Sequence, residues 1–527
     1  MQGRGAVLTS QLTAADHREM TAYDLLEPIC AVRCPKTGFR GQQWSPVLLH
    51  EAGTESYRIA CSLARANKEW AAAVRLYRSS QQVLIVNGLD DAALRVIARD
   101  CPLLRKFSFK HVREFKQQWL EFQREEFSFS DAAVLAFFEA CPLLEVALLG
   151  CAFHGMSART MTLLSRTCSH IVELDLFGLE GSRAIGRPCS LTSTSLSSFL
   201  TGCGRLRKLQ LSALPCVTDE IVMCIDALHP SLSVLHLWRV PISNASLKGS
   251  EWRQLQELSL NSTLHMTTGC FNGVYFSRLT TLAIGHMHVE GFTPLATACP
   301  CLVALKLTMG TTIACSLSDL VLPLLSILDL SENSDWPSQA YDGLSAENLP
   351  RLSSLSLNGG DISPLITSNE IQNFALRCQQ LTEIDLNWTD ENRGVVDDAA
   401  VEAIAQHCVN LKALCLAGAS ITDVALHACT RLTGLSFLHL TSVPGVTDAG
   451  LRAVAVGCPL LWSFGGKSFN QDYADDDDNF LWTLDGYLQL CKDVLSHRPR
   501  GHNGLLTTPF RIEPFGHLHG LWCRSFL

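Results

Sequence analysis

Cys408-Val-Asn-Leu411-Lys-Ala-Leu414-Cys-Leu416 is the stretch that decides the fold, because its spacing of a cysteine and three leucines returns through most of the chain. The same phrase, with an aliphatic residue at each leucine position, begins at Cys168, Cys203, Cys299 and Cys378. Cys101 is followed at the same spacing by Leu104, Phe107 and Phe109. Repetition at intervals of roughly 23 to 40 residues predicts a stacked solenoid in place of one globular core.

The Leu-x-Leu that closes each phrase predicts a short strand, whose two leucines pack inward while the residue between them points to the opposite face. Copies without the cysteine keep this strand pattern, and they begin at Leu232, Leu255, Leu279, Leu325, Leu352 and Leu435. Together these copies amount to about twelve units.

Several strands are followed by a helix-start signal, as at Val217-Thr218-Asp219, Ile421-Thr422-Asp423 and Val446-Thr447-Asp448. The Thr or Asp oxygen can accept hydrogen bonds from free backbone N–H groups of the first helical turn. From Thr447 to Cys458 apolar residues recur at helical spacing, which predicts a helix that runs to the next cysteine.

With its cysteine-bearing copies and Thr-Asp helix starts, the span 83–466 resembles the cysteine-containing leucine-rich repeats of F-box receptor proteins. The resemblance implies an α/β fold, a leucine-rich-repeat solenoid in which a curved parallel sheet carries its helices on the outside.

The chain has 22 cysteines, and many of those in the repeats share one position, at the end of a helix just before the strand. There a cysteine is expected to act as a small buried hydrophobe and to stay a free thiol. No Cys-x-x-Cys pair suggests zinc. Two clusters, Cys30 with Cys34 and His517 with His519 and Cys523, lack a complete four-ligand spacing.

A second informative segment precedes the repeats, where apolar residues recur every three or four positions between Ser56 and Tyr77. This spacing predicts an amphipathic helix with one strong stripe. Its core, Leu63 to Trp70, is similar to the last part of an F-box, and Lys68 stands two residues before Trp70 as in that motif.

An F-box docks on a Skp-type adaptor and so joins a cullin ubiquitin ligase. The resemblance therefore implies an adaptor-binding set on the opening of the motif and on the helical stripe. Its members are Pro46, Leu48, Leu49, Ile59, Leu63, Ala66, Lys68 and Trp70. The alternative is that the segment caps the open N-terminal end of the solenoid. Ser45 stands where the motif has leucine before its proline, and the stretch between the two halves is short.

The residues between and just after the paired leucines are expected to project from the open, concave face of the sheet, where a target protein would bind. The candidates are Asp175, Phe177, His236, Trp238, Lys306, Asp329, Asp385, Asn387 and His439.

Composition and missing motifs exclude other classes of function. A net charge of −9 argues against a nucleic-acid surface. The sequence has no uninterrupted apolar stretch of about 18 residues, so we expect no membrane span, and we find no secretion signal. Motifs for nucleophile activation, phosphate binding and zinc hydrolysis are absent, so we expect neither catalysis nor a cofactor.

Four segments are expected: an N-terminal extension that need not be ordered (1–40), the F-box-like segment (41–82), the solenoid (83–466), and an acidic linker with a C-terminal cap or tail (467–527). The expected function is the substrate-recognition subunit of an SCF-type ubiquitin ligase, with a Skp-family adaptor and a cullin complex as partners, in the cytoplasm or nucleus. The alternative is a leucine-rich-repeat scaffold or regulator that binds no adaptor.

Overall fold

The computed structural model describes residues 82–86, 91–109, 130–148, 156–177, 191–249, 251–261, 266–308, 310–331, 333, 336, 338–357, 366–387, 396–417, 419–441, 443, 445–461, 463–465 and 511–513. The chain forms two compact units, which are residues 1–127 with 136–144 and residues 128–135 with 145–527. Residues 41–81 of the F-box-like segment, including all eight predicted adaptor-binding residues, lie outside the described residues.

The first unit contains strand β1 (Val83–Val86), helix α6 (Asp91–Asp100) and strand β2 (Lys106–Phe109). The two strands are parallel, with Val83 opposite Lys106 and Val86 opposite Phe109. Helix α7 (Asp131–Ala140) has residues in both units. Its Phe137 ring lies 4.8 Å from the Phe107 ring, and both side chains are buried.

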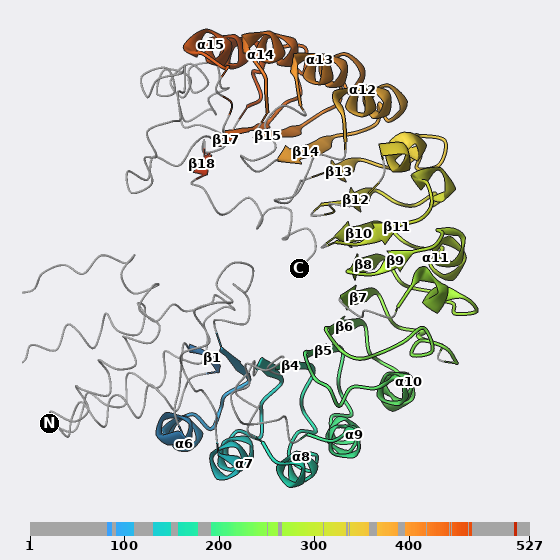
Figure 1. Ribbon diagram of the computed structural model, residues 1–527. Coiled ribbons are helices and arrows are strands. Elements are labelled where there is room, and N and C mark those ends of the chain that lie inside the picture. Colours follow the sequence, from blue (N-terminus) through green and yellow to red (C-terminus); the bar gives the residue numbers. More distant parts are fainter. Residues whose placement is uncertain are drawn as a thin grey trace, which may run out of the picture. The chain divides into compact units, whose positions relative to one another are not determined.

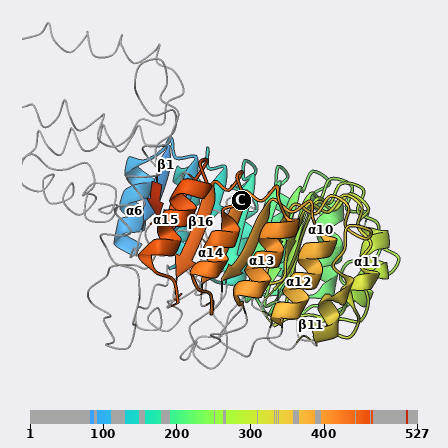
Figure 2. The same ribbon diagram turned by 90° about the horizontal axis from the view of Figure 1, so that it is seen from above.

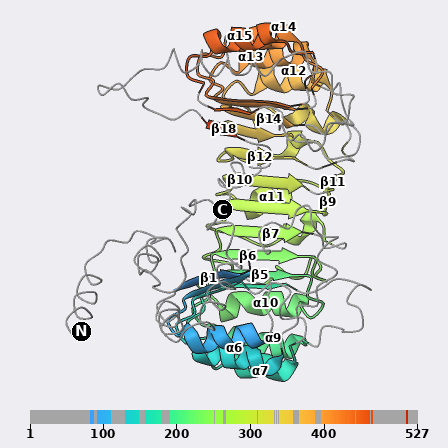
Figure 3. The ribbon, with the colours of Figure 1, turned by 90° about the vertical axis from the view of Figure 1, so that its left-hand side faces the viewer.

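The second unit is built on one parallel sheet whose strands follow one another in chain order. Figure 3 shows many of them running side by side in one direction. They are β3 (Val146–Leu148), β4 (Glu173–Phe177), β5 (Lys208–Ser212), β6 (Val234–Trp238), β7 (Glu257–Asn261), β8 (Thr281–Gly285), β10 (Ala304–Thr308), β12 (Ile327–Asp329), β13 (Ser354–Ser356), β14 (Glu383–Asn387), β15 (Ala413–Ala417), β16 (Phe437–Thr441), β17 (Ser463–Gly465) and β18 (Arg511–Glu513).

Helices cover one face of this sheet (Figure 1), and α12 to α15 lie next to one another in chain order (Figure 2). The α-helices are α8 (Ala158–Leu164), α9 (Ser193–Gly202), α10 (Asp219–Leu228), α11 (Thr293–Ala298), α12 (Ser368–Arg377), α13 (Asp398–His407), α14 (Asp423–Cys429) and α15 (Asp448–Gly457). The parallel sheet and helical layer confirm the leucine-rich-repeat solenoid predicted from the sequence.

The cysteine-to-leucine spacing has a direct structural cause, which is a tight turn between helix and strand. The carbonyl of Cys203 accepts a hydrogen bond from Leu206 N at 3.1 Å, and Cys408 does the same for Leu411 at 3.0 Å. The following residue then begins the ladder, as when Arg207 N donates to Val172 O at 2.8 Å. The paired leucines of the strands are fully buried, so each strand turns one face to the helices.

Five cysteines were predicted to be buried free thiols, and the structure confirms this, because all five are buried and none forms a disulfide. They are Cys168, Cys203, Cys299, Cys378 and Cys408. The Cys408 thiol contacts the neighbouring repeat, where it donates to Cys378 O at 3.8 Å. Cys458 stands at the same repeat position, and its thiol donates to Cys429 O at 3.4 Å. Burial raises the pKa of Cys168, Cys378 and Cys408 to about 12, so these thiols stay protonated.

The position held by these cysteines does not require cysteine, as the copies without it had indicated. His229, Trp252, Leu322, Leu349 and Leu432 occupy it in other repeats, and their carbonyls accept the same turn hydrogen bond. All five side chains are buried. The requirement at this position is therefore a buried side chain before the strand.

The Thr-Asp helix starts link successive repeats. Thr447 caps its own helix by accepting a hydrogen bond from Ala449 N at 3.1 Å. Asp423 of the preceding repeat accepts hydrogen bonds from Thr447 N at 2.7 Å and from its hydroxyl at 2.5 Å. Asp398 accepts the equivalent pair from Thr422, both at 2.7 Å. The aspartates thus bind the next helix cap and do not only stabilise their own helices.

The helix start predicted at Thr218 is present, since Thr218 is the N-cap residue of α10, but the expected capping hydrogen bond is not. Asp219 instead accepts hydrogen bonds from Ser243 N at 2.7 Å and Ser243 Oγ at 2.6 Å. In the middle repeats the outer layer is made partly of short 3-10 turns, which the sequence pattern did not predict. These turns are η5 (Thr268–Phe271), η6 (Leu317–Asp319) and η7 (Ser338–Gly343), and strands β9 (His288–Val289) and β11 (Thr312–Ile313) pair beside them.

Candidate functional site

The sheet face that points away from the helices carries the predicted target-binding residues, and we call it the inner face. Strand register places residues of the same repeat position side by side in rows, for example Gln210 beside His236. The central row holds six of the nine predicted residues: Asp175, His236, Lys306, Asp329, Asp385 and His439. The remaining three, Phe177, Trp238 and Asn387, are two residues further along their strands.

Asp175 on β4 is the most unusual side chain of this row. Its relative exposure is only 4%, and its Oδ1 has no hydrogen-bond partner. Its row neighbours are the uncharged Leu148 and Gln210. Burial raises the pKa of Asp175 to about 7, although Lys208 acts in the opposite direction. The sequence prediction that this carboxylate projects openly from the face is therefore incomplete.

Strands β6 and β7 carry an imidazole-carboxylate pair and a stacked cation. His236 Nε2 lies 2.7 Å from Glu257 Oε1, and both side chains are partly exposed. The guanidinium carbon of Arg239 lies 5.7 Å from the centre of the Trp238 ring, a distance compatible with a cation-π contact. Arg239 has a φ of 51°, in the left-handed region that non-glycine residues seldom adopt. The backbone thus turns sharply just beyond Trp238.

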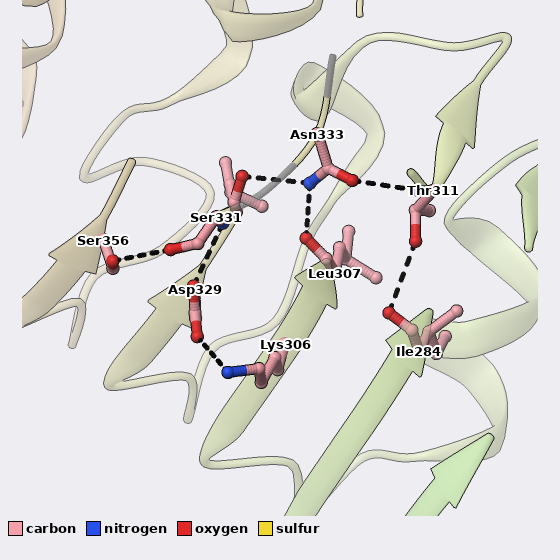
Figure 4. A network of polar contacts seen from close by, with 9 residues as sticks. Ile284, Lys306, Leu307, Thr311, Asp329, Ser331, Asn333 and Ser356 are labelled. Atoms are coloured by element: carbon pink, nitrogen blue, oxygen red, sulfur yellow. Dashed lines mark hydrogen bonds and ion pairs between the residues drawn. The ribbon is translucent and has the colours of Figure 1, made fainter. Parts of the chain in front are cut away.

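The middle of the sheet contains a continuous polar network (Figure 4). Lys306 Nζ lies 2.8 Å from Asp329 Oδ2, and Asp329 Oδ1 accepts a hydrogen bond from Ser331 N at 3.0 Å. The Ser331 hydroxyl then lies 2.8 Å from the Ser356 hydroxyl. These contacts hold the side chains of three neighbouring strands in fixed positions.

Asn333 closes the same network at the ends of the strands. Its Nδ2 donates to Leu307 O at 2.5 Å and to Leu330 O at 2.9 Å. Its Oδ1 accepts from Thr311 N at 3.0 Å, and Figure 4 shows the amide lying between the two strand ends. One side chain therefore satisfies backbone groups at the ends of β10 and β12, and it fixes the edge of the inner face.

Three titratable residues lie in register on β14, β15 and β16: Asp385, Cys415 and His439. The Cys415 thiol is hydrogen-bonded to Asp385, and its pKa is raised well above the usual range by burial and then by the Asp385 and Glu383 carboxylates. Burial lowers the pKa of His439 to about 4. A protonated thiol beside a neutral imidazole offers no activated nucleophile.

The structure therefore brings together six predicted residues in one row. Trp238 is half-buried on the same face, whereas the side chains of Phe177 and Asn387 lie outside the described residues. The sequence prediction missed a second row on the same face, which lies two residues before the central row along each strand. This row contributes Glu173, Lys208, Glu257 and Glu383. The alternation that selected the central row also places the residue before the first leucine on this face, so the signal was present.

The described part of the chain contains no group of three or more His, Cys, Asp or Glu side chains arranged to hold a metal ion. Among the same residues, no helix combines the length and apolar character that a membrane crossing requires.

No protein-family model matches this chain. Three solved structures are similar to it. The complex of Rad7 and Elc1 in yeast has 15% identity and a TM-score of 0.41, over 89% of this chain and 98% of that chain. An internalin from Listeria monocytogenes has 14% identity and a TM-score of 0.35, over 79% and 95% of the two chains. The Toll–Spatzle complex of Drosophila has 13% identity and a TM-score of 0.38, over 74% and 47%. The assignment of the leucine-rich-repeat fold rests on the strand register and repeated turns described above.

Proposed function

We propose that this chain is a non-catalytic substrate-recognition subunit of a cullin-type ubiquitin ligase. In this proposal the segment 41–82 docks on a Skp-family adaptor, and the inner face of the sheet binds the target protein. The chain would act in the cytoplasm or nucleus and transfer no ubiquitin itself.

The observation that carries the proposal is the inner face itself. Polar, charged and aromatic side chains stand there in rows on a hydrogen-bonded sheet, with contacts such as Lys306 to Asp329 and His236 to Glu257 holding them in place. A surface that is ordered before binding loses little conformational entropy when a partner binds, which suits protein recognition. The resemblance of residues 63–70 to an F-box supplies the link to a ligase.

Trp70→Ala tests the adaptor arm of the proposal. Trp70 shares its predicted helical stripe with Ile59, Leu63 and Ala66, so its loss should abolish adaptor binding and leave the melting temperature of the repeats unchanged. Glu69→Ala is the matched control, because Glu69 lies off that stripe and should bind the adaptor normally. The measurement is co-purification of the full chain with a Skp-family adaptor and a cullin, together with a melting curve.

The ligase proposal is refuted if the wild-type chain binds no adaptor, or if Trp70→Ala binds it as well as the wild type does. The alternative function is a leucine-rich-repeat scaffold without adaptor binding, which the departures from the F-box pattern at Ser45 and its surroundings favour. That alternative predicts a different result for Trp70→Ala, namely a loss of stability of roughly 3–5 kcal/mol because a buried aromatic side chain is removed from a cap.

A further inference from the structure

The residues between the buried cysteine position and the next strand line one edge of the sheet, which we call the turn edge. Before β4 to β8 it consists of residues 169–172, 204–207, 230–233, 253–256 and 277–280. These residues include no carboxylate, and they include four exposed arginines, which are Arg205, Arg207, Arg253 and Arg278. The chain as a whole has a net charge of −9, so the charge of this edge is opposite in sign to that of the protein. Such a local concentration of charge favours a partner of the opposite charge.

Most of this positive charge is not balanced within the described part of the chain. Among the described residues, one carboxylate forms an ion pair with these arginines, and it is Glu251, which pairs with Arg253. The other side-chain contacts of the four arginines are those of Arg205 Nη1, which lies 3.4 Å from His170 Nδ1, and of Arg278 Nη1, which donates to Gln254 Oε1 at 2.8 Å. Three guanidinium groups therefore have no carboxylate partner among the described residues.

The carboxylates that border the turn edge on the inner face are engaged by other groups. Glu173 and Glu257 begin β4 and β7 directly after the turns. Glu173 Oε1 lies 3.4 Å from Lys208 Nζ, and Glu257 Oε1 lies 2.7 Å from His236 Nε2. The start of the inner face therefore does not compensate the arginines of the turn edge.

Stabilisation of helix ends does not account for all of these arginines. A cation near the carboxyl end of a helix interacts favourably with the helix dipole, and Arg205 and Arg207 follow α9 closely enough for this effect. Among the described residues, however, no α-helix lies between β6 and β8. Arg253 and Arg278 thus follow turns that no α-helix precedes, and their charge has no helix dipole to offset.

The backbone of the same turns offers further donors to an anion. Cys203 O accepts a hydrogen bond from Leu206 N at 3.1 Å, and Trp252 O accepts one from Leu255 N at 3.2 Å. Each turn bond leaves out the N–H groups of the two residues that it encloses. Among the described residues, these N–H groups donate to no acceptor in the chain, and they belong to Gly204, Arg205, Arg253 and Gln254. Backbone N–H groups beside guanidinium groups suit the binding of carboxylates.

We propose that the turn edge before β4 to β8 binds an acidic, extended segment of a partner protein. Carboxylates of this segment accept hydrogen bonds from Arg205, Arg207 and Arg278, and the turn N–H groups serve as additional donors. The planar guanidinium group can donate two parallel hydrogen bonds to one carboxylate, which suits arginine to this task better than lysine. The turn edge is a different surface from the rows of the inner face, so this inference does not depend on the ligase proposal.

The spacing of the strands sets the length of the segment. Neighbouring strands lie about 4.8 Å apart, so the turns of Arg205 and Arg278, which precede β5 and β8, are separated by roughly 14 Å along the sheet. An extended chain covers this distance with about five residues. A short acidic stretch is therefore long enough to contact all the arginines of the edge, and no folded domain is required.

The test is a titration of the full chain with a fluorescently labelled peptide that alternates glutamate with glycine. The double variant Arg205→Gln with Arg207→Gln should weaken binding by roughly fivefold, and Arg278→Gln by roughly twofold to threefold. The double variant Arg159→Gln with Arg452→Gln is the matched control, since these exposed arginines lie on α8 and α15. It removes two charges and should leave the affinity unchanged. Melting curves should coincide for all of these proteins, because every replaced side chain is exposed.

Ionic strength adds a second readout. Salt screens exposed ion pairs, so wild-type affinity for the glutamate peptide should fall between about 50 and 200 mM salt. The variant that lacks Arg205 and Arg207 forms fewer ion pairs with the peptide, so its affinity should fall less over the same range. An equal fall in both proteins would contradict a role of these arginines in binding.

The proposal is overturned if the glutamate peptide does not bind the wild type, if a lysine-glycine peptide binds equally well, or if the control variant weakens binding as much as the turn-edge variants. Tighter binding of a single-stranded oligonucleotide than of the peptide would replace the protein partner by nucleic acid. The acidic run Asp475–Asp478 of the chain itself is tested by replacing its four aspartates with asparagine. Peptide binding that appears only in that variant would assign the turn edge to this run and overturn the partner segment.

Discussion

Replacing Asp175 by asparagine should make the protein more stable at neutral and alkaline pH. Asparagine has nearly the same shape as aspartate but carries no charge. The pKa of Asp175 is raised from 3.8 to about 7 by burial, so the folded protein keeps a proton that the unfolded chain has already lost. The stability that this group contributes is fully present below about pH 4 and is lost as the pH rises to 7. A difference of about three pKa units corresponds to at most about 4 kcal/mol.

The measurement is the free energy of unfolding in urea, taken for wild type and Asp175→Asn at several pH values between 4 and 8. The two proteins should be similarly stable at pH 4, and the variant should become the more stable one as the pH rises. Glu220→Gln on the exposed side of α10 is the control and should follow the wild type at every pH. A difference between Asp175→Asn and wild type that does not change with pH would show that the carboxylate is not held neutral by burial.

Three further predictions concern the packing of the repeats. Asp423→Ala removes two hydrogen bonds to Thr447 and should lower the free energy of unfolding in urea by about 2–3 kcal/mol. The control Glu402→Ala, on an exposed helix face, should change it by less than about 0.5 kcal/mol. Equal losses in the two variants would contradict the link between repeats. Burial lowers the pKa of His229, so its contribution to stability is present above about pH 6.5 and is lost at lower pH. His229→Cys should flatten the acid side of the stability profile, and an unchanged acid limb would refute this. A maleimide reagent should leave five thiols of the native protein unmodified and label them after unfolding, as followed by mass spectrometry; rapid labelling of the native protein would show that they are accessible. These thiols belong to Cys168, Cys203, Cys299, Cys378 and Cys408.

Much of the fold could be predicted from the sequence, because the repeat pattern reports burial directly. The leucines of Leu414-x-Leu416 are fully buried, and the residue between them, Cys415, lies on the opposite face of the strand as expected. The strand positions of copies without cysteine were equally predictable, since Leu235 and Leu237 occupy the same places. Local alternation is sufficient when each repeat contacts mainly its neighbours.

Other features depend on contacts between repeats and could not be predicted. The sequence shows that Asp219 follows a threonine, but only the structure shows that it accepts from Ser243 in the next repeat. The 3-10 turns of the middle repeats lie outside the Leu-x-Leu pattern, which describes the strands alone. The burial of Asp175 depends on how side chains pack over the face, whereas alternation predicts only which face it occupies.

The pair of contacts from Asp423 to Thr447 makes the length of this protein adjustable in whole repeats. Residues 423–447 begin directly after one Thr and end at the next, and both threonines precede an Asp. A second copy of this segment inserted after Thr447 would restore the Thr-Asp junction at both of its ends, so every cap would still find an acceptor in the repeat before it. The inserted chain would add one strand beside β16 and one helix beside α14. The inner face can be lengthened by duplication of a short coding segment, with no change to the residues that already line it.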